Sequence, residues 1–204
     1  MRLILARHGQ TAANVRMALD SRPPGGPLTE EGRRQAEELA AALADEPVVG
    51  VYASTAIRAQ QTAEPIAAGH GLAVQVVDGI QEVSAGDLEG RTDRDALRRF
   101  VEVASAWTNG DLDRTMPGGE TGQEAVERFT TALKSLRAAH TDDGALVVVS
   151  HGAMLRLVGP LLADNLATFG EISLLQNTAR IVLEEDSTTR GGWHCVEWAG
   201  VRLG

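Results

Sequence analysis

Short apolar segments alternate with longer amphipathic segments along most of this chain, and this alternation narrows the choice of fold more than any other feature. Four runs of four to six apolar residues are bounded by polar or turn residues, at 3–6, 48–53, 73–77 and 146–149. Such runs predict buried strands. Apolar residues at helical spacing predict helices over 28–44, 55–68, 93–107 and 120–139. Alternating strands and helices favour a three-layer α/β/α fold, with a mostly parallel central sheet and helices on both faces.

The C-terminal part of the chain departs from this pattern. Residues 179–184 and 193–198 flank a turn-rich stretch, which predicts a hairpin and an antiparallel edge strand. Residues 83–122 are the richest in Gly, Asp and Arg, and we expect them to form a cap or lid. No internal repeat or Pro/Ser-rich linker divides the chain, so we expect a single domain over residues 1–204.

The charge balance excludes several classes of partner. The chain has 19 Lys and Arg against 28 Asp and Glu, a net charge of −9. A surface of this sign repels polyanions, so we expect no nucleic-acid partner and no membrane partner. No apolar run approaches the roughly 18 residues of a membrane span. Cys195 is the only cysteine, so no intrachain disulfide can form. We expect a cytoplasmic protein, either a monomer or a homodimer.

Polar residues follow three of the four predicted strands at the point where each strand ends. Arg7 and His8 follow the first, Ser54 follows the second with Arg58 one helical turn later, and His151-Gly152 follows the fourth. Carboxyl ends of parallel strands meet at one edge of a sheet, where ligands bind. Helices that begin near residues 55 and 152 would direct free N–H groups to the same edge, which suits an anion. Two arginines, two histidines and helix N-termini together predict a phosphate pocket.

The remaining histidines give no such signal. His70 lies in a Gly-flanked loop, His140 follows a predicted helix, and His194 lies in a predicted strand. His194 and Cys195 are adjacent, but neighbouring strand residues point to opposite faces, so they do not predict a metal site. No carboxylate cluster or His/Cys spacing argues for a metal, and we expect no metal and no cofactor.

Five ordered segments carry a resemblance to a known family. The run LILARHGQTAAN is similar to the opening motif of the histidine phosphatase superfamily, the phosphoglycerate mutase-like fold. Four further segments resemble that family in the expected order: PLTEEGRRQAEELA, YASTAIRAQQTAEPIA, IQEVSAGDLEGRT with PGGET downstream, and VVVSHGAMLRLV. The resemblance covers residues 3 to about 160 and implies an enzyme of the phosphatase branch.

The resemblance also implies roles for individual residues. His8 would be the nucleophile that accepts the phosphoryl group, and Arg7, Arg58 and His151 would hold its oxygens. Glu82 matches the proton donor. The remaining positions implied to contact or support the phosphate are Asn14, Gln10, Thr11, Ser54 and Gly152.

General chemistry agrees with these roles. Phosphate monoesters hydrolyse extremely slowly unaided, and a covalent intermediate divides the reaction into easier steps. A nucleophilic imidazole must be neutral, and adjacent arginines disfavour its cationic form. The leaving alkoxide needs a proton from a nearby acid, which Glu82 can supply; Asp87 and Glu89 are interpreted as solvated lid or turn residues. We therefore expect hydrolysis of a small phosphorylated substrate through a phosphohistidine.

Several departures from the family pattern bear on specificity. Ala13 and Leu88 stand where the family often has aromatic residues, and residues 18–24 differ from the usual loop. These positions would line or support the substrate mouth, so the sequence does not name the substrate. One alternative is a cofactor-dependent phosphoglycerate mutase, although QEVSAG replaces the ERHYG-like segment of mutases. A further alternative is a non-catalytic domain that binds a phospholigand.

Overall fold

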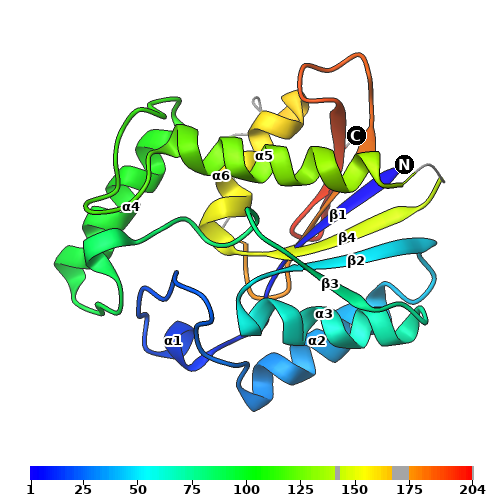
Figure 1. Ribbon diagram of the computed structural model, residues 1–204, viewed down its shortest axis with the longest axis horizontal. Coiled ribbons are helices and arrows are strands. Elements are labelled where there is room, and N and C mark those ends of the chain that lie inside the picture. Colours follow the sequence, from blue (N-terminus) through cyan, green and yellow to red (C-terminus); the bar gives the residue numbers. More distant parts are fainter. Residues whose placement is uncertain (141–142, 167–174, 204) are drawn as a thin grey trace.

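One mixed sheet forms the centre of the protein, seen here in a computed structural model that describes residues 1–140, 143–166 and 175–203 (Figure 1). Within these residues seven strands pair in the order β3-β2-β4-β1-β5-β6-β7. The parallel strands are β1 (Arg2–Arg7), β2 (Val48–Ser54), β3 (Val74–Val77) and β4 (Ala145–Ser150). The antiparallel strands are β5 (Arg180–Glu185), β6 (Trp193–Trp198) and β7 (Val201–Arg202).

The sequence predictions for the sheet are confirmed, with one extension. All four apolar runs form parallel strands, and the C-terminal hairpin is present as β5 and β6. The antiparallel part is larger than a single edge strand, because β5 pairs directly with β1 and β7 adds a short outer strand. The result is a mostly parallel α/β core with an antiparallel extension on one side.

Both faces of the sheet are buried, which is why the interior positions of its central strands β1 and β4 are apolar. Leu3 and Leu5 of β1 pack into the core on one face, whereas Ile4 and Ala6 pack into the core on the other. Side chains alternate between faces along a strand, so a fully apolar strand needs cover on both sides.

Helices supply that cover in two groups (Figure 1). The helices on the face that contains Ile4 and Ala6 are α2 (Glu30–Ala42) and α3 (Ile57–Gly69). The helices on the opposite side are α4 (Arg94–Thr108), α5 (Gly122–Ala138) and α6 (Gly152–Leu162). This confirms the predicted three-layer arrangement. No described helix is long and apolar enough to cross a membrane.

Local sequence signals set the helix starts. The Thr29 side chain accepts a hydrogen bond from the Gly32 N–H at 3.0 Å and begins α2. Asp93 caps α4 in the same way, and Thr121 begins α5 with a reciprocal capping box. Helix α1 (Ala12–Val15) was not predicted, because four residues give too little periodicity to recognise.

The segment 83–122, expected to be a cap, contains the 3₁₀ turn η1 (Gly86–Leu88) and α4. It leaves the sheet and reaches the end of the molecule where α1 lies (Figure 1). A second 3₁₀ turn, η2 (Asp164–Leu166), follows α6. The role of the segment 83–122 as a lid remains a prediction.

A close backbone contact fixes α2 against the loop that follows β1. A Cβ added to Gly32 would lie 2.1 Å from the carbonyl oxygen of Gln10, and one added to Gly9 would lie 2.6 Å from the carbonyl oxygen of Gly32. Only glycine permits this approach at both positions. The contact sets the position of the loop that begins with His8.

We therefore expect Gly32→Ala to lower both stability and activity. The added methyl group must displace either the loop or the helix, at a cost of about 1–3 kcal/mol in the free energy of unfolding. Gly69→Ala in α3 is the matched control, because a Cβ there meets nothing within 4 Å. Denaturant unfolding of the two variants measures the difference, and equal stability would contradict this account of the contact.

Candidate active site

The strand order brings the predicted site residues to one edge of the sheet. β4 lies between β1 and β2, and Arg7 at the end of β1 is in register with Ser150 at the end of β4. The next residues along the chain are His8 and His151, so both histidines leave the sheet side by side. Their ring centroids are 5.1 Å apart. Residues 143 positions apart therefore meet because parallel neighbours end together.

A buried guanidinium joins the two histidines. Arg58, in the first turn of α3, is 2% exposed. Its Nε lies 3.2 Å from Nε2 of His8, and its Nη2 lies 3.2 Å from Nδ1 of His151. Arginine can only donate, so both of these ring nitrogens must present a lone pair.

This requirement fixes the tautomer of each ring. The proton of His8 then sits on Nδ1, which donates to the carbonyl of Gly9 at 2.7 Å. The proton of His151 sits on Nε2, which donates to the hydroxyl of Ser54 at 2.7 Å. His8 is left with an unprotonated Nε2 beside Arg58, which is the form that a nucleophile needs.

Burial and nearby cations hold both histidines in the neutral state. Desolvation lowers the pKa of His8 well below its ordinary value of 6.5, and the charges of Arg58 and Arg7 lower it further. Desolvation, followed by the neighbouring His8 and Arg58, likewise lowers the pKa of His151. Each imidazolium would add a positive charge to a buried site that already contains arginine.

Backbone and side-chain contacts hold the His8 segment in place. The His8 N–H donates to the carbonyl of Ser150 at 3.0 Å, which continues the ladder between β1 and β4. The Gly9 N–H donates to the buried hydroxyl of Thr62 in α3 at 2.9 Å. The side chain of Asn177 donates to the carbonyl of His8 at 3.0 Å. The imidazole is thus supported by neighbouring elements on several sides.

Arg7 provides a second cation with a free donor. Its Nη1 donates to the carbonyl of Leu175 at 2.6 Å, but its Nε is buried and has no hydrogen-bond partner in the described residues. A Cβ on Gly152 would lie 3.2 Å from that Nε, so Arg7 packs closely against the start of α6. A buried donor without a partner is costly, and an anion in the adjacent pocket would satisfy it.

Glu82 lies at the N-terminus of α6. Its Oε1 accepts hydrogen bonds from the N–H groups of Val83 at 3.0 Å and Met154 at 2.8 Å, and its Oε2 accepts from Ala153 at 3.1 Å. The positive end of a helix favours a carboxyl group in this position. The three N–H groups orient the carboxyl group, which also lines the pocket that contains His8.

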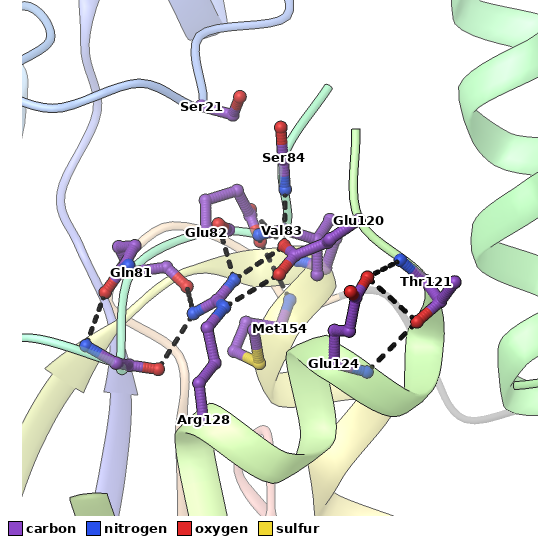
Figure 2. Close-up of polar contacts among 12 residues, drawn as sticks. Ser21, Gln81, Glu82, Val83, Ser84, Glu120, Thr121, Glu124, Arg128 and Met154 are labelled. Atoms are coloured by element: carbon purple, nitrogen blue, oxygen red, sulfur yellow. Dashed lines mark hydrogen bonds and ion pairs between the residues drawn. The ribbon is translucent and has the colours of Figure 1, made fainter. Parts of the chain in front are cut away.

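Arg128 of α5 holds the backbone on both sides of Glu82 (Figure 2). Its guanidinium donates to the carbonyl oxygens of Gly79, Gln81 and Glu82 at 2.8–3.0 Å. Its other donors bind both carboxylate oxygens of Glu120, at 2.9 and 2.8 Å. Glu120 in turn accepts from the N–H of Ser84 at 2.7 Å. The Glu82 segment is therefore held against α5 by a partly buried, bidentate ion pair and its hydrogen bonds.

A cavity of about 110 Å³ contains most, but not all, of the residues expected at the site. Among the expected residues, those that line it are Arg7, His8, Thr11, Asn14, Arg58 and Glu82. His151 does not line it and reaches it through Arg58. Ser54 supports His151 from behind, and Gln10 turns toward α2, where it accepts from the Thr29 hydroxyl at 2.9 Å.

The cavity has further lining residues that the sequence did not assign individually: Ala18, Leu19, Asp20, Ser21, Ala85 and Phe100. Four of these belong to the loop after α1, which the sequence identified only as unusual and near the substrate mouth. The Asn177 contact with His8 was also missed, because no motif marks that residue. Ala13 and Leu88 are buried and do not line the cavity.

Glu89 has a different place from the one expected. It was interpreted as a solvated lid or turn residue, but its carboxylate accepts from the Ser21 N–H at 2.9 Å, from the Ser21 hydroxyl and from the Arg22 N–H at 3.2 Å. In addition, the Leu19 N–H donates to the carbonyl of Arg91 at 3.0 Å, and the Gly90 N–H donates to the carbonyl of Leu19 at 2.6 Å. Glu89 therefore fastens the loop that lines the cavity to the segment 85–91. The local sequence pattern around Glu89 cannot reveal such a long-range contact.

No group of three or more His, Cys, Asp or Glu side chains in the described part of the chain is arranged to hold a metal ion. The described residues instead bring two arginines, two neutral histidines and a helix N-terminus around one cavity. The fold and the site define an α/β protein with a cationic, anion-accepting pocket at the carboxyl edge of its sheet.

The chain belongs to the histidine phosphatase superfamily. The family model for branch 1 of this superfamily matches residues 3–200. The adenosylcobalamin/alpha-ribazole phosphatase of Salmonella typhimurium is 34% identical over 158 residues, which cover 78% of this chain and 77% of that protein. A probable phosphoglycerate mutase of Cronobacter sakazakii is 32% identical over 208 residues, which cover 98% of this chain and 93% of that protein.

Two mycobacterial proteins extend this comparison. The structure of a mycobacterial glucosyl-3-phosphoglycerate phosphatase in complex with VO3 superposes with a TM-score of 0.82 and 26% identity, covering 98% of this chain and 99% of that one. A PE-PGRS family protein of Mycobacterium tuberculosis is 32% identical over 97% of this chain, which spans only 36% of that protein's length. The fold and the family predicted from the sequence are confirmed.

The electrostatics of the site predict the effect of removing Arg58. We expect Arg58→Gln to raise the pKa of both His8 and His151, because the guanidinium charge lowers both. Long-range ¹H–¹⁵N NMR of the imidazole nitrogens measures this. Arg98→Gln is the matched control, because it removes the same charge from an exposed position of α4. It should leave the pKa of both histidines unchanged. Imidazolium signals in the wild-type protein at pH 7 would contradict the proposed neutral pair.

The same shifts predict how stability depends on pH. An unfolded histidine takes up a proton near pH 6.5, whereas the buried pair resists protonation. The unfolded state then binds more protons, so the free energy of unfolding should fall as the pH drops below about 6.5. Because Arg58→Gln raises the folded pKa values, the fall should be shallower in that variant. Denaturant unfolding between pH 5 and 8 tests the sign.

Proposed function

We propose that this protein is a phosphatase that hydrolyses a small phosphate monoester through a covalent phosphohistidine on His8. The observation that carries the proposal is the neutral His8, whose unprotonated Nε2 faces the buried guanidinium of Arg58 inside the cavity. A lone pair beside a preformed cation suits attack on an incoming phosphoryl group. The named phosphatases among its relatives support the same class of reaction.

In the first step Nε2 of His8 attacks phosphorus and the ester P–O bond breaks. The bond between Nε2 and phosphorus forms as the leaving oxygen departs with its electron pair. Glu82, entering the step as the acid, gives its proton to that oxygen, so a neutral alcohol leaves. Arg58 and the free Nε of Arg7 stabilise the charge on the phosphoryl oxygens.

In the second step water replaces His8 on phosphorus. The carboxylate of Glu82 accepts a proton from the attacking water, the P–Nε2 bond breaks, and inorganic phosphate is released. Glu82 is then the acid again and His8 is again neutral, so atoms and charges balance over the cycle. The three backbone N–H groups that orient the Glu82 carboxyl group support a role in which it serves twice from one position.

The surroundings of the cavity support a metal-independent reaction on a small substrate. Two arginines and the N-terminus of α6 already supply positive charge where a metal would otherwise act. Ala85 and Phe100 of the segment 83–122 line the cavity, which supports its proposed role as a cap within a single domain.

A cofactor-dependent phosphoglycerate mutase is the second candidate, favoured by the similarity to a probable mutase over most of both chains. That enzyme would return the phosphoryl group to a second substrate instead of to water. Release of inorganic phosphate from a monoester, without added bisphosphoglycerate, distinguishes hydrolysis from transfer. A non-catalytic domain would bind phosphate but release none, so the same assay also tests that alternative.

The proposed intermediate predicts a labelled protein. Brief mixing with ³²P-labelled substrate should leave label that is stable in alkali and lost in acid, as expected for phosphohistidine. His8→Ala should remove the label and lower turnover about 10⁴-fold or more. His151→Ala should leave a trace of each, because His151 acts through Arg58.

Two further treatments complete this test. Activity should survive EDTA, and vanadate should inhibit it, because vanadate can become five-coordinate in a pocket built for phosphoryl transfer. Full activity in His8→Ala would contradict the proposed mechanism. Loss of activity on chelation that a divalent ion restores would do the same.

The proposed acid role of Glu82 predicts a dependence on the leaving group. Glu82→Gln should lower turnover of an alkyl phosphate about 10²-fold or more, because the amide cannot supply the proton. The loss with p-nitrophenyl phosphate should be much smaller, since p-nitrophenolate leaves without protonation. Glu89→Gln is the control, because it disturbs the loop contacts of Ser21 without touching the reaction and should affect both substrates alike. Equal losses in Glu82→Gln would move the acid role to another group.

A further inference from the structure

One carboxylate lines the cavity without an assigned role. Asp20 belongs to the loop that follows α1, and its side chain is 24% exposed. Its main-chain carbonyl accepts from Nη2 of Arg58 at 2.9 Å, so the residue is tied to the phosphate-directed guanidinium. Neither His8 nor Glu82 needs Asp20 for the steps proposed above.

The carboxylate of Asp20 retains capacity to accept hydrogen bonds. Its Oδ2 lies 3.5 Å from Nη1 of Arg58 and 3.4 Å from the N–H of Gly26, both long for a hydrogen bond. An ionised carboxylate offers about four acceptor positions. A donor on a bound substrate could therefore be accepted at full strength.

The backbone around Asp20 is held firmly. The flanking Leu19 and Ser21 are fixed by the segment 85–91 and by Glu89, as described above. Gly25 has a φ of +64°, and a Cβ there would lie 2.3 Å from Nη1 of Arg58 and 3.3 Å from Oδ1 of Asp20. The loop thus folds closely over the Arg58–Asp20 pair, which keeps the carboxylate at the cavity.

Cations are few among the residues that line the cavity. Arg7 and Arg58 are the cations among the described lining residues, and in the proposed mechanism the phosphate would engage both. Apart from His8, Glu82, Thr11 and Asn14, the rest of the described lining is small or apolar: Ala18, Leu19, Ala85 and Phe100, together with Ser21, whose hydroxyl donates to Glu89. A second anionic group beside the ester would meet a carboxylate and no spare cation, whereas a hydroxyl group would meet an acceptor.

We propose that Asp20 is a specificity-determining residue that selects phosphate monoesters whose leaving group carries a hydroxyl group two carbons beyond the ester carbon, as in polyol or sugar phosphates. It disfavours esters that carry a carboxylate at that place. This inference rests on the proposed phosphatase function. A partly buried acceptor that faces the ligand discriminates against ligands that do not supply its donor.

A matched pair of substrates tests this inference. Glycerol 3-phosphate and 3-phosphoglycerate differ in whether the far carbon is a hydroxymethyl or a carboxylate group. The wild-type enzyme should favour glycerol 3-phosphate at least about tenfold in kcat/KM, or in inhibition constant against p-nitrophenyl phosphate hydrolysis. In Asp20→Ala the preference should shrink to within about threefold.

Asp20→Asn separates charge from hydrogen bonding. The amide keeps an acceptor but loses the negative charge, so it should improve 3-phosphoglycerate while retaining much of the glycerol 3-phosphate rate. Asp87→Asn is the control, since Asp87 is an exposed carboxylate in η1 that does not line the cavity. It should leave the preference unchanged.

The outcomes separate this inference from the function on which it rests. If the wild-type enzyme does not hydrolyse p-nitrophenyl phosphate or either ester, the proposed function fails and this inference fails with it. If p-nitrophenyl phosphate is hydrolysed but the preference is absent, or is unchanged in both Asp20 variants, only the assignment of Asp20 is overturned. A loss shared by all three substrates reports the disturbed Arg58 and leaves the ratio as the deciding quantity.

Discussion

The site depends on a buried cation that is held between two neutral histidines. Arg58 is almost fully buried and donates to one nitrogen of His8 and one of His151. Removing a guanidinium from water is expensive unless its donors find acceptors, and here the imidazole lone pairs and the carbonyl of Asp20 supply them. The same contacts fix both tautomers and oppose protonation of both rings. One interaction therefore satisfies the buried guanidinium and leaves His8 with the unprotonated nitrogen that the proposed mechanism requires.

The central sheet makes that arrangement possible. Because β4 lies between β1 and β2, the residues that follow these three strands are immediate neighbours at one edge. Contacts from more distant elements then hold the chain around the cavity. Arg128 of α5 clamps the segment that carries Glu82, and Glu89 clamps the loop that carries Asp20. Both clamps pair a charged side chain with backbone groups, which fixes main-chain position as well as charge.

Prediction from the sequence was accurate where the controlling forces are local or periodic. The four parallel strands followed from apolar runs, and α2, α3, α4 and α5 followed from apolar residues at helical spacing. It was inaccurate or silent where placement depends on a distant partner. Gln10 adjoins the His8 motif yet turns toward α2, and Glu89 looks like a surface residue yet anchors a loop. Asn177 supports His8 without any neighbouring motif.

The sequence by itself determined the fold class, the family and the set of polar residues that follow the strands, because periodicity and short motifs encode them directly. Only the tertiary structure decided how those residues face one another. It placed His151 behind Arg58 instead of in the cavity wall, chose the nitrogen of His8 that keeps its lone pair, and directed Asp20 into the lining. Each of these results depends on hydrogen bonds between residues far apart in the chain, which no local pattern records.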